Sequence, residues 1–407
     1  MMTSRSRQQQ PSPRSALERG TPSRRLIRAL AAIVAAWFSF GYELTAQEAG
    51  VRAIPTRPGA AGSASAKTVP PSARPEQKAQ PAAPKRAAST ATTRFPDPEW
   101  VDIAVAARRL GLKVAWTAAG REAVLTNREM RLEVAADRRE ISVDGRRVFL
   151  GQPLLSRGGD LFITKIDLER CVVPIVKPAL IAGRKRRPNV IVIDPGHGGP
   201  DKGMINERFN LFEKTYTLDT SLRLKKILES RGWRVVLTRT DDRQLKPSKA
   251  DDLRRRAEIA DEAGADVFVS VHFNAVPDQE EKVSGVEVYR YTPQHQPPIG
   301  RGVRRIDDAQ PSPGNGNDPW NSLLADSIHR AMLRGMKLDD RGLKHERFAV
   351  LRLVSCPAVL VEAGFMSNSA EAKRIATAAH RQQLAEAMAD GITAYQKILE
   401  QLVADRK

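Results

Sequence analysis

Three apolar segments in the second half of the chain each end beside a polar side chain that can bind a metal ion or exchange a proton. The segments cover residues 190–199, 267–275 and 358–368, and the polar side chains are His197, His272 and Glu362. An apolar run of four or five residues is typical of a buried strand. Because open α/β sheets place their ligands beyond the carboxyl ends of their strands, we expect these three side chains to lie close together.

Strands and helices alternate along residues 189–402, which we expect to form one α/β domain. Apolar runs predict strands at residues 190–193, 234–237, 267–271, 286–291 and 358–361. Helical spacing predicts helices at residues 212–231, 248–263, 322–336 and 370–402. This alternation predicts a largely parallel sheet that is covered by helices and joined by right-handed crossovers. Residues 292–319 are rich in proline and glycine and are expected to form a long loop.

A smaller α+β domain is expected at residues 95–182. Residues 101–110 have helical spacing that closes at Gly111, and short alternating runs follow them. Asp144-Gly145 marks a hairpin turn between two of these runs. The region holds no histidine and no cluster of carboxylates, so we assign it a structural or wall-binding role. A short basic linker, residues 183–188, follows this domain.

The first 46 residues have the composition of an export signal. Seven arginines precede residue 29, an uncharged and mostly apolar run covers residues 29–42, and Leu44-Thr45-Ala46 offers a cleavage site. The run is shorter than the ~20 residues that comfortably span a bilayer. A cleaved signal is therefore favoured over a retained membrane anchor, and a buried core helix fits the preceding arginines poorly. Membrane contact is expected only through an uncleaved signal, and the protein is expected in the periplasm or elsewhere in the cell envelope.

Residues 47–94 are rich in Ala, Pro, Ser, Lys and Arg and contain few large apolar side chains. Such a segment cannot bury enough surface to order itself, which predicts a disordered linker. Residues 1–95 also hold 15 Lys or Arg and four Asp or Glu, so they carry +11 of the formal charge of +19. No basic stretch is interleaved with aromatic residues, so we expect no nucleic-acid partner. Attraction to an anionic cell envelope is the better explanation of the charge.

The expected cluster has the side chains of a zinc hydrolase. Such sites commonly take three ligands from His and Asp or Glu and leave a fourth position to water. His197 follows a strand in a glycine-rich turn, and His272 ends another strongly apolar strand. Glu362 directly follows an apolar run, where a carboxylate is desolvated unless it lies near a cation. Glu213 lies at the start of a predicted helix. From the residues alone, the better explanation is that its negative charge interacts favourably with the helix dipole. His345 lies near a loop that we expect to approach substrate.

No His-Glu-x-x-His helix motif is present, so the usual metalloprotease arrangement is excluded. Cys171 and Cys356 are the only cysteines, which is too few for a disulfide framework. Two buried free thiols are favoured over a disulfide between the two domains.

Eight sequence blocks fall in an order that matches one known family. They are Ile193-Asp-Pro-Gly-His-Gly-Gly199, Phe212-Glu-Lys214, Leu237-Thr-Arg-Thr240, Asp252-Leu-Arg-Arg-Arg-Ala257, Ser270-Val-His-Phe-Asn-Ala275, Gly285-Val-Glu-Val-Tyr289, Arg341-Gly-Leu-Lys344 with Val350-Leu351, and Pro357-Ala-Val-Leu-Val-Glu-Ala-Gly-Phe-Met-Ser-Asn368. With these blocks, residues 189–398 resemble the zinc-dependent N-acetylmuramoyl-L-alanine amidases of the type-3 family. The resemblance implies a twisted, mostly parallel sheet with helices on both faces. It also implies cleavage of the amide bond between N-acetylmuramic acid and L-alanine of the peptidoglycan stem peptide.

The resemblance implies Zn²⁺ ligands at His197, Glu213 and His272, and a catalytic glutamate at Glu362. It therefore reverses the interpretation of Glu213 that the residues alone favour. Asn274 is expected to shape the substrate groove. Some family members carry a helical insertion that blocks the zinc until a partner displaces it. Residues 292–319 are too rich in proline and glycine for such a helix, although a protein activator remains open.

The smaller domain carries a second resemblance. Its helix is followed by Leu110-Gly-Leu-Lys-Val-Ala-Trp116, Val143-Asp-Gly-Arg146 and Leu161-Phe-Ile-Thr164. This order resembles the copper-amine-oxidase N-terminal-like domain, a module often appended to bacterial envelope enzymes. That module has no copper site, so no copper is expected here.

Two other functions remain open from the sequence. One is an amidase-like module that binds peptidoglycan without cutting it, and the presence of all four implied site residues argues against it. The other is a zinc peptidase that acts on stem peptides, which shares the chemistry and differs only in its substrate cleft.

Overall fold

The computed structural model describes residues 97–181, 183, 187–277 and 280–404. The expected signal (residues 1–46) and linker (residues 47–94) lie outside the described residues and stay predictions. Within the described residues, no helix combines the length and the apolarity that crossing a bilayer requires.

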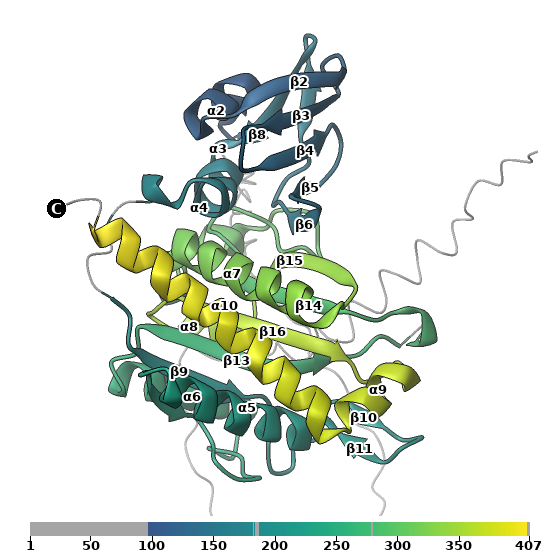
Figure 1. The fold of residues 1–407 in the computed structure, drawn as a ribbon, viewed down its shortest axis with the longest axis vertical. Coiled ribbons are helices and arrows are strands. Elements are labelled where there is room, and N and C mark those ends of the chain that lie inside the picture. Colours follow the sequence, from purple (N-terminus) through teal and green to yellow (C-terminus); the bar gives the residue numbers. More distant parts are fainter. Residues whose placement is uncertain (1–96, 182, 184–186, 278–279, 405–407) are drawn as a thin grey trace, which may run out of the picture. The chain divides into compact units, whose positions relative to one another are not determined.

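The chain after residue 189 is built on a mixed sheet, whose first six strands lie in the order β12-β9-β13-β16-β14-β15 (Figure 1). β12, β9, β13 and β16 run parallel, β14 is antiparallel to β16, and β15 is parallel to β14. The prediction of a mostly parallel α/β sheet is confirmed, with β14 and β15 as its two reversed strands. The strand bounds are β9 Val190–Pro195, β12 Arg234–Leu237, β13 Val267–Asn274, β14 Val286–Tyr291, β15 Asp340–Glu346 and β16 Ala358–Phe365.

Helices cover both faces of this sheet (Figure 1). Ile191 and Ile193 of β9 belong to the core under α5, α7 and α10, whereas Val192 belongs to the core under α6 and α8. Because successive residues of β9 enter opposite cores, its first four residues are all apolar and do not alternate. The helix bounds are α5 Glu213–Ser230, α6 Lys249–Glu262, α7 Asp318–Met336, α8 Ala349–Leu353 and α10 Ala378–Ala404.

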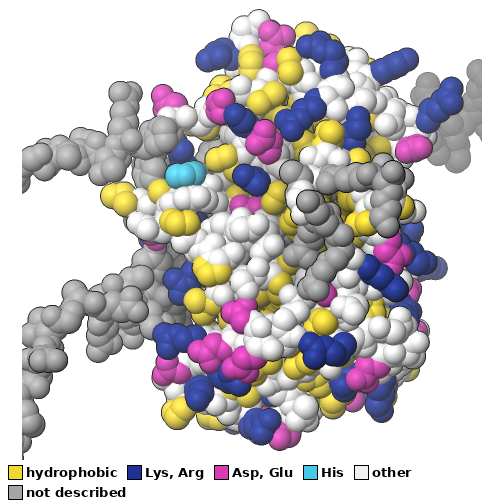
Figure 2. Space-filling view, turned by 90° about the vertical axis from the view of Figure 1, so that its left-hand side faces the viewer, with side chains coloured by type: hydrophobic (Ala, Val, Ile, Leu, Met, Phe, Trp, Pro, Cys, Tyr) yellow, Lys and Arg dark blue, Asp and Glu magenta, His cyan; other side chains and the backbone are white. Residues whose placement is uncertain are grey.

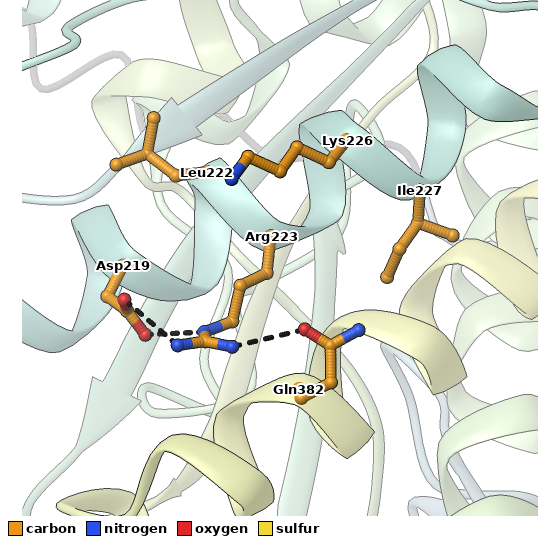
Figure 3. Close-up of a pocket in the computed structure, with 6 residues that line it drawn as sticks. All are labelled: Asp219, Leu222, Arg223, Lys226, Ile227 and Gln382. Atoms are coloured by element: carbon orange, nitrogen blue, oxygen red, sulfur yellow. Dashed lines mark hydrogen bonds and ion pairs between the residues drawn. The ribbon is translucent and has the colours of Figure 1, made fainter.

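The helix predicted at residues 370–402 is two helices, α9 (Ser369–Ile375) and α10. The hydroxyl of Thr377 accepts a hydrogen bond from the backbone N–H of His380 at 3.3 Å, which caps the start of α10. α10 then packs beside α5. Figure 3 shows Arg223 of α5 bonded through Nε to Asp219 (2.8 Å) and through a terminal nitrogen to Gln382 of α10 (3.1 Å).

The loop expected at residues 292–319 is largely as predicted. All of these residues are described, and up to Asn317 they contain two short 3-10 helices, Ile306–Ala309 and Pro313–Asn317, and no α-helix. α7 begins at Asp318, four residues before its predicted start, because a proline fits the first turn of a helix. The strand β15 was not predicted. A register shift against β14 interrupts its alternation near Gly342.

The region before residue 182 adds five antiparallel strands to the same sheet and a three-stranded sheet of its own. β6 joins the two halves, because Val148 pairs in parallel with Leu343 of β15. The sheet therefore runs across the predicted domain boundary, and the division into residues 95–182 and 189–402 stays a prediction. The bounds are α2 Ile103–Leu110, β1 Trp100–Asp102, β2 Lys113–Ala118, β3 Glu122–Thr126, β4 Arg131–Ala135, β5 Glu140–Val143, β6 Arg146–Phe149, β7 Leu155–Arg157, β8 Asp160–Thr164, α3 Lys165–Asp167 and α4 Val173–Val176.

A buried arginine of α6 holds the carboxyl end of β9. Arg256 is 3% exposed and donates to the carboxylates of Asp194 and Asp252, each at 2.8 Å. It also donates to the backbone carbonyls of Pro195 (2.9 Å) and His197 (2.8 Å). The guanidinium therefore forms ion pairs with two buried carboxylates and fixes the loop that leaves the strand.

Replacing Arg256 with alanine should destabilise the fold strongly. Asp194 and Asp252 would be left as unpaired carboxylates in the core, a change that typically costs about 3–5 kcal/mol. Urea denaturation of the full chain measures the free energy of unfolding. Arg254 lies on the same helix and pairs with Asp251 on the surface, so Arg254→Ala is the matched control, with an expected loss within about 0.5 kcal/mol. Equal losses in the two variants would contradict the assignment.

Candidate metal centre

His197 lies in the glycine-rich loop after β9, with a left-handed backbone (φ 62°). Two glycines leave room around it. A Cβ on Gly196 would meet the His272 ring at 2.3 Å, and a Cβ on Gly203 would meet the Glu213 carboxylate at 2.4 Å. Larger residues at these two positions would separate the three side chains. The glycine-rich turn is therefore required by the close approach of His197, Glu213 and His272.

Glu213 occupies the centre of the cluster. It is the first residue of α5, is 2% exposed, and its carboxylate accepts hydrogen bonds from the backbone N–H groups of Met204 (2.8 Å) and Phe273 (3.1 Å). One oxygen lies 3.0 Å from Nε2 of His197, and the other lies 2.9 Å from Nδ1 of His272. The ligand atoms of these three residues all lie within 4.8 Å of one another.

The donor set fits zinc. Two imidazoles and one carboxylate on three separate elements are the usual protein ligands of a zinc site that keeps an open position. Asp201 lies 3.0 Å from Nδ1 of His197 and orients that ring, as an outer carboxylate does around many metal-ligating histidines. The sequence therefore predicted all three members of the cluster, although it needed the family resemblance to include Glu213.

The three side chains perturb one another electrostatically. Burial by itself lowers the pKa of His197, but the carboxylates of Glu213 and Asp201 outweigh it and raise that pKa to about 9. Burial would raise the pKa of the Glu213 carboxyl, yet the two imidazoles hold it well below its usual value. Burial lowers the pKa of His272. Without a metal, Glu213 is therefore an anion held between two imidazoles.

Glu362 lies beside this cluster and outside its three ligands. It is the cross-strand partner of His272 on β13 and of Glu287 on β14, and it is 7% exposed. Among the described residues its Oε2 has no hydrogen-bond partner. Burial, then the charges of Glu213 and Glu287, raise the pKa of Glu362 well above its usual value. A raised pKa and a free oxygen suit a group that takes and returns a proton.

Asn274 reaches the same face of the sheet, but both ends of its amide are occupied. Its Nδ2 donates to Glu287 at 2.9 Å, and its Oδ1 accepts from the backbone N–H of Ala275 at 2.7 Å. Sequence reasoning missed Glu287, which is 3% exposed on β14. The available signal was a charged residue inside an apolar strand, because such a residue has to be paired.

The remaining histidines do not join the cluster. His345, expected near a loop that approaches substrate, lies in β15 and is fully buried. Its Nδ1 is 3.4 Å from the hydroxyl of Thr292, where the loop of residues 292–319 begins. His329 is buried on α7 and pairs with Asp340 at 3.0 Å. Cys171 and Cys356 are both buried and are not joined in a disulfide, as predicted.

On the face drawn in Figure 2, basic and acidic side chains are interspersed. A surface pocket between α5 and α10 is lined by Asp219, Leu222, Arg223, Lys226, Ile227 and Gln382, none of which is a predicted site residue (Figure 3).

Known proteins match the same part of the chain. The family model described as N-acetylmuramoyl-L-alanine amidase matches residues 191–394. The germination-specific N-acetylmuramoyl-L-alanine amidase of Bacillus subtilis is 29% identical over 215 residues, which are 51% of this chain and 79% of that protein. The probable cell wall amidase LytH of Staphylococcus aureus is 31% identical over 206 residues, which are 50% of this chain and 57% of that protein.

Two solved structures resemble the same region. The amidase AmiC2 of Nostoc punctiforme is 32% identical, with a TM-score of 0.42 over 53% of this chain and 99% of that one. The CwlD amidase of Clostridioides difficile, solved in complex with the GerS lipoprotein, is 27% identical, with a TM-score of 0.43 over 52% of this chain and 99% of that one.

The match to the family model begins in β9 and ends within α10, so it contains the whole cluster described above. It also spans half of the 407 residues. This chain therefore belongs to the N-acetylmuramoyl-L-alanine amidase family of cell-wall hydrolases.

Proposed function

We propose that residues 189–402 cleave the amide bond between N-acetylmuramic acid and L-alanine of the peptidoglycan stem peptide with one Zn²⁺ ion. His197, Glu213 and His272 would hold the metal. The observation that carries the proposal is the convergence of these three ligand atoms within 4.8 Å beside a buried glutamate with a free oxygen.

Zn²⁺, when bound, supplies a Lewis acid that polarises the amide carbonyl and makes water more acidic. The protein's own part is acid–base chemistry at Glu362. Its Oε2 takes a proton from the attacking water and returns that proton to the departing amino group of L-alanine. Asn274 acts by holding Glu287 next to Glu362, and its occupied amide favours this positioning role over direct contact with substrate.

We also propose how the rest of the chain serves this reaction. Residues 1–46 would direct export to the periplasm or cell envelope, and residues 47–94 would tether the folded part. Residues 95–182 would form a copper-amine-oxidase N-terminal-like domain without copper, since they contain no histidine. No nucleic-acid partner is part of the proposal, and a protein activator stays a prediction.

Digestion of purified peptidoglycan separates the amidase from its two alternatives. With the full chain and zinc, we expect intact stem peptides with a free L-alanine amino terminus, identified by mass spectrometry. A chelator should abolish the release, because it removes the metal from the side chains that hold it. Added zinc should restore the release, because those side chains remain in the protein. Shortened stem peptides would instead indicate a peptidase, and wall binding without products would indicate a binding module.

Glu362→Gln should leave zinc bound and remove most of the activity. The substitution keeps the size of the side chain but removes the proton acceptor, and loss of general acid–base catalysis costs about 10²–10⁴-fold in rate. Zinc content is measured by metal analysis and activity by stem-peptide release. Glu386→Gln on the exposed side of α10 is the control and should match the wild type. A Glu362→Gln enzyme with near-normal activity would refute the assignment of the base.

Zinc binding should displace a proton at neutral pH. A histidine ligand has to be neutral, whereas His197 in the metal-free protein has a pKa of about 9 and is protonated at pH 7. Apparent zinc affinity should therefore rise about tenfold per pH unit from pH 7 and level off near pH 9. Calorimetry in two buffers of different ionisation enthalpy counts the protons released. Asp201→Asn should shift the plateau to lower pH, because Asp201 helps to raise the pKa of His197. A zinc affinity that does not change with pH would contradict the displacement of a proton from His197.

A further inference from the structure

A buried carboxylate next to the metal centre gathers two cations. Glu287 accepts hydrogen bonds from the Lys344 ammonium (2.5 Å) and from Nε of Arg341 (3.3 Å) on one oxygen. Its other oxygen accepts from Asn274 (2.9 Å) and from the hydroxyl of Tyr289 (2.7 Å). Each oxygen has two donors, so the position of Glu287 is firmly set, and both cations are anchored to it.

This group lies directly beside the proposed base. Glu287 and Glu362 are cross-strand partners in the antiparallel pair β14–β16, and such partners have Cβ atoms about 4.5–5.5 Å apart. Among the described residues, no ion pair joins Glu362 to Lys344 or Arg341. The two cations are therefore separated from Glu362 by one carboxylate on the neighbouring strand, and the charge of Lys344 acts on the Glu362 carboxyl.

Arg341 is the member of the group that remains open to a ligand. Its side chain is 33% exposed, and among the described residues only its Nε has a hydrogen-bond partner. The guanidinium lies 5.4 Å from the centre of the Phe365 ring, at the end of β16. Its two terminal nitrogens are the part of an arginine that binds a carboxylate in a fork.

Lys344 is more enclosed, with a side chain that is 15% exposed. Its ammonium lies 5.6 Å from the Phe149 ring centre and 5.9 Å from that of Tyr289. Phe149 belongs to β6, so the smaller domain helps to shield this cation. Glu287 balances one of the two positive charges of Lys344 and Arg341, and the other is available to an anion.

We propose that Arg341, supported by Lys344 and Glu287, is a subsite for a carboxylate of the stem peptide, so that the enzyme prefers an acidic peptide. The inference rests on the amidase function proposed above and adds the recognition of the residue that follows L-alanine. A carboxylate is favoured because a partly exposed guanidinium over an aromatic ring offers two parallel N–H donors and one unbalanced charge.

A matched pair of substrates tests the subsite. N-acetylmuramoyl-L-alanyl-γ-D-glutamyl-L-lysinamide carries a free α-carboxylate on the second residue. Its counterpart N-acetylmuramoyl-L-alanyl-D-isoglutaminyl-L-lysinamide carries a carboxamide there and no other carboxylate, because the γ-carboxyl is in the peptide bond to lysinamide in both substrates. The wild type should favour the acid by about 10–100-fold in kcat/KM, mainly through KM, as expected for a charged hydrogen bond. Arg341→Gln should reduce this ratio to about one, whereas Arg254→Gln on the exposed side of α6 should leave it at the wild-type value.

The outcomes are distinguishable. Equal cleavage of the two substrates by the wild type, or equal losses on both in Arg341→Gln, would overturn the subsite and leave the amidase function standing. Cleavage of neither substrate, together with no product from peptidoglycan, would overturn the amidase function and this inference with it. Zinc content and thermal unfolding check that the variants fold. If Arg341→Gln does not fold, Arg341→Lys is the deciding variant, because it keeps the positive charge without the two terminal nitrogens of the guanidinium. A reduced preference for the acid is expected in this variant. An unchanged preference would overturn the subsite.

Discussion

The candidate metal centre depends on two buried arginines that hold one loop by its backbone. Arg239 is 1% exposed and donates to the carbonyls of Pro195 (3.0 Å) and Gly196 (2.8 Å), while Arg256 donates to those of Pro195 and His197. A non-glycine residue with a left-handed backbone is strained, and it persists only where its surroundings hold it. The two guanidinium groups hold this loop, and they keep His197 facing Glu213.

Three buried carboxylates on one side of the sheet have different environments and therefore different chemistry. Glu213 lies between two imidazoles and stays ionised, which makes it suited to bind a cation. Glu287 is bonded to four donors and is a fixed counter-charge. Glu362 has a raised pKa and an oxygen that no described residue bonds, which makes it suited to exchange protons. The same functional group thus serves three purposes because the neighbouring charges and hydrogen bonds differ.

Local pattern predicted much of the fold and most of the cluster. The five predicted strands after residue 189 are all present. β9, β13 and β16 are the clearest of them, because a strand buried on both faces leaves a nearly continuous apolar run that is visible without a structure. β15 was missed because it contains charged residues and an irregular register, and its burial comes from pairing with β14 and β6. Glu213 shows the limit most clearly, since a ligand at a helix start has the same local sequence as a favourable charge there.

The sequence by itself determined which segments are strands, which residue types end them, and, through the order of its motifs, the amidase family. Only the tertiary structure decided which of the polar side chains touch. Asn274 is engaged by Glu287 and Ala275, Glu287 lies opposite Glu362, and the smaller domain extends the sheet through β6 and brings Phe149 to Lys344. These contacts join residues far apart in the chain, so they depend on strand order and register, and local composition carries no information about either.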